Sequence, residues 1–347
     1  MMSRWFIAFM LIFSACTKKQ AAPDDAKTVN LAIWGNYLTP ELQQKFTDMT
    51  GIKINISNYS SNEELLAKIQ SGASGIDVAV PSDYMVEIMK KLNLLQEIDP
   101  AQIPNSQNIE STWLKKDYDS ENKYSYPYAW SVTGIAIHKD LYKGKIKSWK
   151  DFFNNQDLAG KLSVLDDVRE TMGAALKAEG HSLNTKNNDD LKKAEDLLIK
   201  AKSKIKMFRS DTMEALVNKE VAVAMAYSTD ALLAEKLSNG KIDFIMAEEG
   251  GSFAIDNMVI LKGTKNLKGA HALINYMLSP EVNTVFVSNV RAGAILKQTR
   301  EFLPEDLKNN PILFLSQELL KKFEGIRDVG EFTQNFDESW TKVKAAK

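Results

Sequence analysis

The side chains of this chain that could take part in chemistry are carboxylates and aromatic rings that follow short apolar segments. Asp167 and Glu170, in the segment VLDDVRET, come directly after the apolar run LSVL, and Tyr227 follows another such run, VAVAMA. Carboxylates form charge-assisted hydrogen bonds with ammonium groups, worth roughly 1.5–3 kcal/mol each, and aromatic faces attract cations by about 0.5–2 kcal/mol. An alkyl polyamine carries protonated amines on an apolar stem. These side chains therefore predict a site for an organic cation.

The spacing of Asp167 and Glu170 also has a purely structural interpretation. An acid followed three residues later by a glutamate resembles a capping box, in which both side chains satisfy free backbone N–H groups at a helix start. The two roles are compatible if Asp167 caps the helix while Glu170 points into a cleft. The sequence alone leaves this choice open.

Further candidates lie where other apolar segments end, or where the chain is expected to cross between lobes. In open α/β sheets, ligands bind beyond the carboxyl ends of the strands. Taken singly, each ring could be a core residue, and each serine could cap a helix. Taken together, they place several rings and at least three acids at one sheet edge. These further candidates are Trp34, Tyr37, Ser82, Tyr84, Ser210, Tyr227 and Asp256.

Alternating strands and helices are expected to position these residues. Apolar strands such as VNLAIW alternate with helices such as TPELQQKFTDMT, which has Thr39 as its cap, Pro40 in its first turn and Gly51 at its end. This pattern favours an α/β fold of two lobes, each a mixed, mostly parallel sheet flanked by helices, joined by a hinge. The predicted lobes are residues 28–133 with 255–300 and residues 134–254 with 301–347.

Composition excludes several classes of function. The 44 Lys and Arg residues balance 45 Asp and Glu residues, for a formal charge of -1, so no basic surplus indicates nucleic-acid binding. The motifs G-x-S-x-G and H-E-x-x-H and the P-loop are absent from the sequence, which disfavours an enzyme. His138, His181 and His271 are far apart and the chain has one cysteine, so neither a metal site nor another cofactor is predicted.

The first residues have the features of an export signal. Arg4 precedes the apolar run WFIAFMLIF, which is shorter than the roughly 20 residues that a membrane span needs. Cys16 follows two small residues, as in a bacterial lipoprotein signal that is cut before a lipidated cysteine. We therefore predict a signal peptide at residues 1–15, lipidation of Cys16 and a polar tether at residues 16–27. The alternative is an ordinary secretory signal that is cut elsewhere.

Several segments, in order along the chain, resemble those of a known family. They include IWGNYLTPELQQKFTDMTGIKI, DVAVPSDYMVEIM, YSYPYAWSVTGIAI, LDDVRET and EEGGSFAIDNMVI. From about residue 28 onward, the chain resembles the spermidine/putrescine-binding component of bacterial ABC transporters, in the type II periplasmic binding-protein fold. The resemblance implies a ligand held between two lobes, with permease and ATPase subunits of the inner membrane as partners.

The resemblance also implies a role for each candidate side chain. It places one amine of the ligand at Asp167 and Glu170 and another at Asp256. It places the other candidates along the ligand, as an aromatic wall with hydroxyl groups beside it: Trp34, Tyr37, Ser82, Tyr84 and Ser210.

Four positions depart from the family pattern. Tyr227 stands where the family often has a tryptophan, so a ring is kept, whereas Ala254 replaces an aromatic that often stacks on the alkyl chain. Arg291 falls where an aromatic is common, and Ile326 falls where a glutamine is common. A cationic Arg291 would repel a polyamine unless an acid neutralises it, or it would hold the carboxylate of a zwitterion. Alternatively, Arg291 points to solvent.

The sequence therefore predicts a monomeric, lipid-anchored protein outside the cytoplasm that captures putrescine or spermidine and delivers it to an ABC permease. One alternative is a binding protein for another cationic or zwitterionic solute such as an amino acid, with Arg291 as a ligand-binding residue. Another is a secreted hydrolase that uses paired carboxylates.

Overall fold

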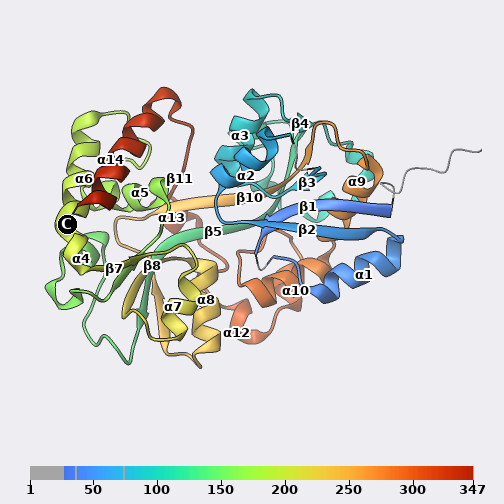
Figure 1. Ribbon diagram of the computed structural model, residues 1–347. Coiled ribbons are helices and arrows are strands. Elements are labelled where there is room, and N and C mark those ends of the chain that lie inside the picture. Colours follow the sequence, from blue (N-terminus) through green and yellow to red (C-terminus); the bar gives the residue numbers. More distant parts are fainter. Residues whose placement is uncertain (1–26, 36, 73–74, 347) are drawn as a thin grey trace, which may run out of the picture.

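The computed structural model describes residues 27–35, 37–72 and 75–346, which form two α/β lobes (Figure 1). The predicted signal peptide, Cys16 and all but the last residue of the predicted tether lie outside the described residues. Within these ranges, no helix is both long enough and apolar enough to cross a bilayer.

Two long strands, β5 (Ser125–His138) and β10 (Ser252–Leu261), lie in the middle of the molecule and connect both lobes. The shorter strands pair outward from them (Figure 1). The strands are β1 (Thr28–Trp34), β2 (Lys53–Tyr59), β3 (Val78–Ala79), β4 (Leu95–Gln96), β5 (Ser125–His138), β6 (Leu162–Val164), β7 (Ile205–Phe208), β8 (Val223–Tyr227), β9 (Ile242–Ile245), β10 (Ser252–Leu261) and β11 (Glu324–Gly325).

Each lobe has a mixed sheet, as predicted. In the first lobe β1 lies parallel to β2 and β3, and β10 pairs antiparallel with β3. In the second lobe β6 lies parallel to β7 and β8, and β5 pairs antiparallel with β8 and β9. All 14 residues of β5 are buried; it pairs with β10 as far as Val132 and with β8 from Thr133 onward. β5 and β10 therefore connect the two lobes.

Helix boundaries follow local capping signals. The first helix begins at Pro40, with the Thr39 side chain accepting from a backbone N–H, and ends at Gly51 in the left-handed region (φ 70°). The helices are α1 (Pro40–Thr50), α2 (Asn62–Gln70), α3 (Asp83–Lys91), α4 (Trp149–Asn154), α5 (Val168–Ala178), α6 (Asn188–Ala201), α7 (Thr212–Val217), α8 (Ser228–Leu237), α9 (Leu267–Met277), α10 (Pro280–Val290), α11 (Thr299–Phe302), α12 (Glu305–Lys308), α13 (Gln317–Leu320) and α14 (Thr333–Ala345).

The C-terminal part of the chain divides between the lobes differently from the prediction, which assigned residues 301–347 to the second lobe. Leu303 and Leu307 are buried in the core of the first lobe, with Phe286. Phe336 belongs to the core of the second lobe. The division differs because α11 packs against α10 of the first lobe. The chain reaches the second lobe only after β11, which pairs with β10.

Candidate ligand-binding site between the lobes

A cavity of about 750 Å³ lies between the lobes, within the usual size range of small-molecule sites. Strand ends and helix starts of both lobes form its wall. It brings together all the predicted ligand-binding residues except Arg291, namely Trp34, Tyr37, Ser82, Tyr84, Asp167, Glu170, Ser210, Tyr227 and Asp256. Their placement around one cavity is consistent with the roles predicted for these side chains in ligand binding.

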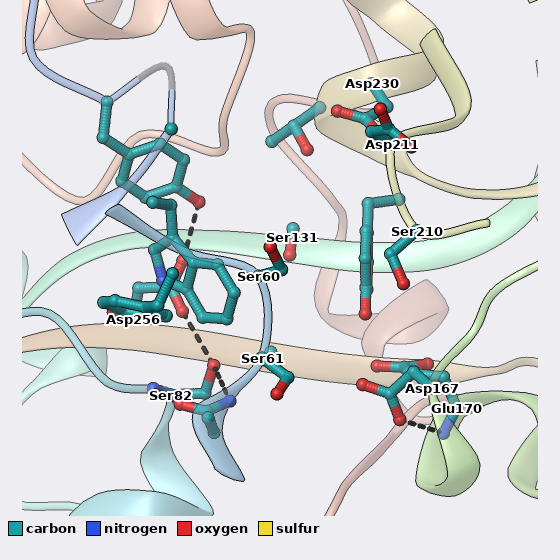
Figure 2. Close-up of a pocket in the computed structure, with 18 of the residues that line it drawn as sticks. Ser60, Ser61, Ser82, Ser131, Asp167, Glu170, Ser210, Asp211, Asp230 and Asp256 are labelled. Carbon is teal, nitrogen blue, oxygen red and sulfur yellow. Dashed lines mark hydrogen bonds between the residues drawn. The ribbon is translucent and has the colours of Figure 1, made fainter. Parts of the chain in front are cut away.

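Asp256 lies on the first-lobe side of the cavity, on β10. The pairing of β5 with β10 shifts register between Asp256 and Asn257, and irregularities of this kind often re-aim a side chain next to a functional site. The Asp256 carboxylate accepts hydrogen bonds from the Tyr37 hydroxyl (2.7 Å) and the Ser82 hydroxyl (2.9 Å), as Figure 2 shows. Two hydroxyl donors therefore hold this carboxylate in one orientation.

Asp256 is 5% exposed, and within the described ranges no basic side chain forms an ion pair with it. Burial raises its pKa to about 6, against the smaller lowering effect of the hydrogen bonds from Tyr37 and Ser82. A buried carboxylate without a counter-cation is unfavourable by several kcal/mol, which a bound cation would offset.

Asp167 and Glu170 lie on the second-lobe side, at the start of α5. Asp167 Oδ1 accepts from the backbone N–H groups of Arg169 (2.9 Å) and Glu170 (3.0 Å), so the predicted capping role of Asp167 is confirmed. Glu170 does not complete a capping box. Its Oε2 accepts instead from the hydroxyls of Thr133 (2.9 Å) and Ser252, which belong to the two long strands. Both carboxylates face the same cavity.

The electrostatics of this acidic pair also favour a cation. Burial, followed by the neighbouring charge of Asp167, raises the pKa of Glu170, and burial together with the charge of Glu63 raises the pKa of Asp167. Arg169 is adjacent, but its guanidinium donates to the carbonyl of Arg327 (3.0 Å) and to Asn184 (3.0 Å). The positive charge of Arg169 therefore only partly offsets the effects that raise the pKa values of Asp167 and Glu170.

The aromatic wall is fixed by polar contacts behind the rings. Trp34 Nε1 donates to the Val80 carbonyl (3.0 Å), and the Trp34 ring lies 4.5 Å from the ring of Tyr59. The Tyr84 hydroxyl donates to Glu63 (2.9 Å). Rings held in this way can pack against an alkyl stem with little further loss of side-chain entropy.

Several residues that line the cavity were not among the predicted ligand-binding residues. Asp83, in the first turn of α3, has its pKa raised to about 7, mainly by burial and also by the charge of Asp256. Ser60 and Ser61 follow β2, so the rule that sites lie beyond strand ends would have found them if it had been applied to that strand. Asp230, in the first turn of α8, is a further acid of the wall.

Arg291 lies outside the residues that line the cavity, in contrast to its predicted place. It ends α10 in the left-handed region (φ 63°), and its guanidinium pairs with Asp306 at 3.4 Å. Its side chain is only 12% exposed, so it does not point freely to solvent either. Its neighbour Val290 lines the cavity instead. Ala254 and Ile326, two other departures from the family pattern, also line the cavity.

A comparison with family models identifies the kind of site. The model described as bacterial extracellular solute-binding protein matches residues 41–314. The chain belongs to this family. This solute-binding protein is 32% identical to spermidine/putrescine-binding periplasmic protein 1 of Haemophilus influenzae, across 99% of this chain and 97% of that protein. It is also 32% identical to the spermidine/putrescine-binding periplasmic protein of Escherichia coli, across 94% of each.

Solved structures give the same fold. The TpPotD lipoprotein of Treponema pallidum matches this solute-binding protein with a TM-score of 0.82 at 30% identity, over 91% of this chain and 99% of that one. The substrate-binding protein PotD of Streptococcus pneumoniae has a TM-score of 0.80 at 28% identity, over 92% and 98% of the two chains. The predicted type II periplasmic binding-protein fold is confirmed.

Membership of the family also settles two broader predictions. Its members bind solutes outside the cytoplasm, at periplasmic or extracellular locations, as predicted for this chain. They are transport proteins and not enzymes, so the alternative of a secreted hydrolase is wrong. Among the described residues, no group of three or more His, Cys, Asp or Glu side chains could hold a metal ion.

Proposed function

We propose that this solute-binding protein captures a polyamine, with putrescine and spermidine as the first candidates, and delivers it to an ABC permease and its ATPase. The main support is the presence, on both sides of one cavity, of buried carboxylates that form no ion pair with any described residue, Asp256 on the first lobe and Glu170 on the second. The names of the Haemophilus influenzae and Escherichia coli relatives point to the same ligands.

The energetics of such a complex are consistent with tight binding. Micromolar affinity requires about 8 kcal/mol net. Two or three charge-assisted hydrogen-bonded groups, at roughly 1.5–3 kcal/mol each, together with methylenes packed on Trp34 and Tyr227, reach that value after the entropy losses of association. The ammonium groups of the ligand would supply the counter-charge that these carboxylates lack among the described residues, and pairing with carboxylates of both lobes would favour closure of the lobes around the ligand.

Isothermal titration calorimetry of the purified protein with putrescine and with spermidine tests this assignment. We expect saturable binding of at least one of them, with a dissociation constant of about 10 µM or lower. The protein should be unfolded and refolded beforehand, to remove any polyamine that purifies with it. Absence of binding by both compounds, on protein shown to be folded by circular dichroism, would exclude a polyamine ligand.

The alternative ligand, a zwitterion such as an amino acid, depends on Arg291. Because its guanidinium pairs with Asp306 and does not line the cavity, we expect Arg291→Ala to change the affinity for a polyamine by less than about twofold and to create no new preference. A thermal-shift panel of amines and amino acids on both proteins measures this. A selective loss of amino-acid binding in the variant would favour the zwitterion.

We further propose that Cys16 carries a lipid that anchors the mature protein to a membrane. One structural relative is itself described as a lipoprotein. When the full chain is expressed in bacteria, Cys16→Ala should shift the protein from the membrane fraction to the soluble fraction, and intact mass measurement should show loss of the acyl groups. Equal membrane association of both proteins would contradict lipidation at this residue.

A further inference from the structure

The edge of the first-lobe sheet that lies opposite the cavity carries a group of exposed lysines. β1 and β2 are parallel and begin side by side, with Thr28 paired to Lys53. The side chain of Asn266, which caps α9, donates to the Thr28 carbonyl at 2.7 Å, so the segment between β10 and α9 lies at the same edge. Figure 1 shows the start of β1 and α9 at the outer end of this lobe. We call this edge the basic end and define it by four exposed lysines, Lys27, Lys53, Lys262 and Lys268.

The surrounding protein does not neutralise the charges of these lysines. Among the described residues, no carboxylate forms an ion pair with any of the four. Lys262 Nζ donates to the neutral side-chain oxygen of Asn93 at 2.8 Å. The nearby acid Asp77 is buried and accepts from Asn30 and Thr264 instead. The basic end therefore presents four positive charges to its surroundings.

Exposed apolar side chains lie among these lysines. Leu267, in the first turn of α9 and next to Lys268, is 41% exposed. Leu92, at the end of α3, is 46% exposed, and Met49, in the last turn of α1 and four residues before Lys53, is 66% exposed. Ammonium groups attract anionic lipid headgroups, and apolar side chains beside them can enter the boundary with the acyl chains. The composition of the basic end therefore matches that of an anionic bilayer surface.

The basic end is also the part of the fold that lies nearest to the proposed lipid anchor along the chain. At no more than about 3.6 Å per residue, the segment from Cys16 to Lys27 spans at most about 40 Å. Residues 17–26 add no net charge, since they contain two lysines and two aspartates. An anchor at Cys16 would hold the basic end near the lipid at a millimolar effective concentration, at which even a weak electrostatic contact is populated.

We propose that the basic end rests on an anionic lipid surface, which orients the anchored protein with its first lobe against the bilayer. This inference deepens the proposed function and rests on lipidation of Cys16. The cavity stays away from the lipid in this orientation, because it lies beyond the other ends of the strands. Thr28 and Trp34 stand at opposite ends of β1, about 20 Å apart at about 3.3 Å per residue. Membrane contact and polyamine capture therefore use separate surfaces.

Flotation with lipid vesicles tests the basic end without the anchor. The chain from residue 17 onward lacks the cysteine and retains every described residue of both lobes. With vesicles of about 30% phosphatidylglycerol in phosphatidylcholine, we expect binding that is half-complete near about 1 mM lipid and lost in about 0.5 M NaCl. Vesicles of phosphatidylcholine alone should not bind the protein.

A charge-reversed variant and a matched control locate the binding surface. The test variant carries Lys53→Glu, Lys262→Glu and Lys268→Glu. It should bind anionic vesicles at least about tenfold more weakly than wild type, since each lysine near such a surface contributes about fivefold. The control reverses three exposed lysines between β5 and α4 of the second lobe, Lys143→Glu, Lys145→Glu and Lys147→Glu. It lowers the net charge equally and should change vesicle binding by less than about threefold.

Two measurements verify that both variants fold. Thermal melts should resemble that of wild type. Neither set of lysines lines the cavity, so the affinity for putrescine and spermidine should stay within about twofold of wild type. If the test variant does not fold, glutamine at the same three positions replaces glutamate and should weaken vesicle binding by at least about fivefold.

Amine labelling of the lipidated full chain tests the orientation. On phosphatidylglycerol vesicles, the lysines of the basic end should react with a reagent that does not cross bilayers at least about threefold more slowly than on phosphatidylcholine vesicles. The three control lysines of the second lobe should react equally on both. Mass spectrometry of peptides measures the labelling at each position.

The outcomes separate this inference from the proposed function. Failure to bind anionic vesicles, or equal weakening by the test variant and the control, overturns the basic end as a membrane surface. Equal labelling on both kinds of vesicle overturns the orientation. If intact mass shows no lipid on Cys16 while flotation depends on the basic end, the anchor fails and the basic end stands. Loss of the polyamine assignment would leave all these results unchanged.

Discussion

Asp256→Asn is expected to lower polyamine affinity by about 100-fold or more, since removing one member of a buried, hydrogen-bonded charge pair costs about 2–5 kcal/mol. The carboxylate of Asp256 is oriented by Tyr37 and Ser82 and has no ion-pair partner among the described residues. An ammonium group of the ligand would supply this counter-charge. The amide has nearly the same shape but carries no charge, and its NH2 group cannot accept from one of the two hydroxyls. The effect therefore reports the loss of the charge and of one hydrogen bond, with packing little changed.

The same change should stabilise the free protein. The pKa of Asp256 is raised to about 6, above the value of an unfolded chain, so its ionisation above that pH disfavours the folded state. At pH 7.5, Asp256→Asn removes this term, and we expect a gain in the free energy of unfolding of up to about 3 kcal/mol, at about 1.4 kcal/mol per pKa unit. If the variant loses polyamine binding and melts at a higher temperature than wild type, damage to the fold is not the cause of the lost binding.

Calorimetric titration and urea unfolding of the same samples measure both effects. Asp77→Asn is a suitable control, because Asp77 is also a buried, hydrogen-bonded acid of the first lobe but does not line the cavity. We expect it to lower stability and to leave affinity within about threefold of wild type. If Asp256→Asn bound polyamine as well as Asp77→Asn does, Asp256 would not be a ligand contact.

Polyamine affinity is expected to fall by roughly 100-fold between pH 7.5 and pH 5. Alkylamines have pKa values near that of lysine, about 10.4, and so stay protonated throughout. Asp256 has its pKa raised to about 6 by burial, and burial also raises the pKa values of Asp167 and Glu170. Protons then compete with the ligand, at about tenfold per group and per pH unit below the pKa. Two such groups account for the predicted loss.

The stability of the ligand-free protein is expected to change with pH in the direction opposite to the polyamine affinity. Carboxyl groups whose pKa is raised by folding hold more protons in the folded chain, so the free protein should lose stability as pH rises from about 4 to about 7. Bound polyamine lowers these pKa values and should reverse the trend. Titrations at several pH values, in two buffers of different ionisation enthalpy, measure both affinity and protons released.

Asp256→Asn should show a flatter pH profile, because one of the titrating groups is gone. Circular dichroism at pH 5 excludes acid unfolding as the cause of weaker binding. Equal affinity of the wild-type protein at pH 5 and pH 7.5 would mean that the cavity carboxylates do not pair with the ligand.

Local patterns in the sequence were enough for the fold class and for much of the site. The alternation of short strands with capped helices predicted two mixed α/β lobes, and the capping residues Thr39 and Asp167 act as predicted. The rule that ligands bind beyond strand ends placed Trp34 and Tyr227 on the cavity wall. These predictions depend on spacing of a few residues, and spacing is what a sequence displays directly.

Features that depend on contacts between residues far apart in the sequence could not be predicted from local patterns. Arg291 lies outside the cavity, because it ends α10 in the left-handed region and its guanidinium pairs with Asp306. Glu170 does not return to its own helix, because hydroxyls of β5 and β10, 37 and 82 residues away, bind its carboxylate. Such contacts join residues that are far apart along the chain.

The sequence by itself determined which segments become strands and helices, where several helices begin, and that acids and rings collect at one sheet edge, since all of these follow from short-range periodicity and capping. Only the tertiary structure decided which acids lack a counter-charge. Charge pairing depends on the three-dimensional neighbours of each carboxylate, such as the guanidinium of Arg209 beside Asp211 and the neutral Thr212 beside Asp230, and these neighbours are set by how the chain folds.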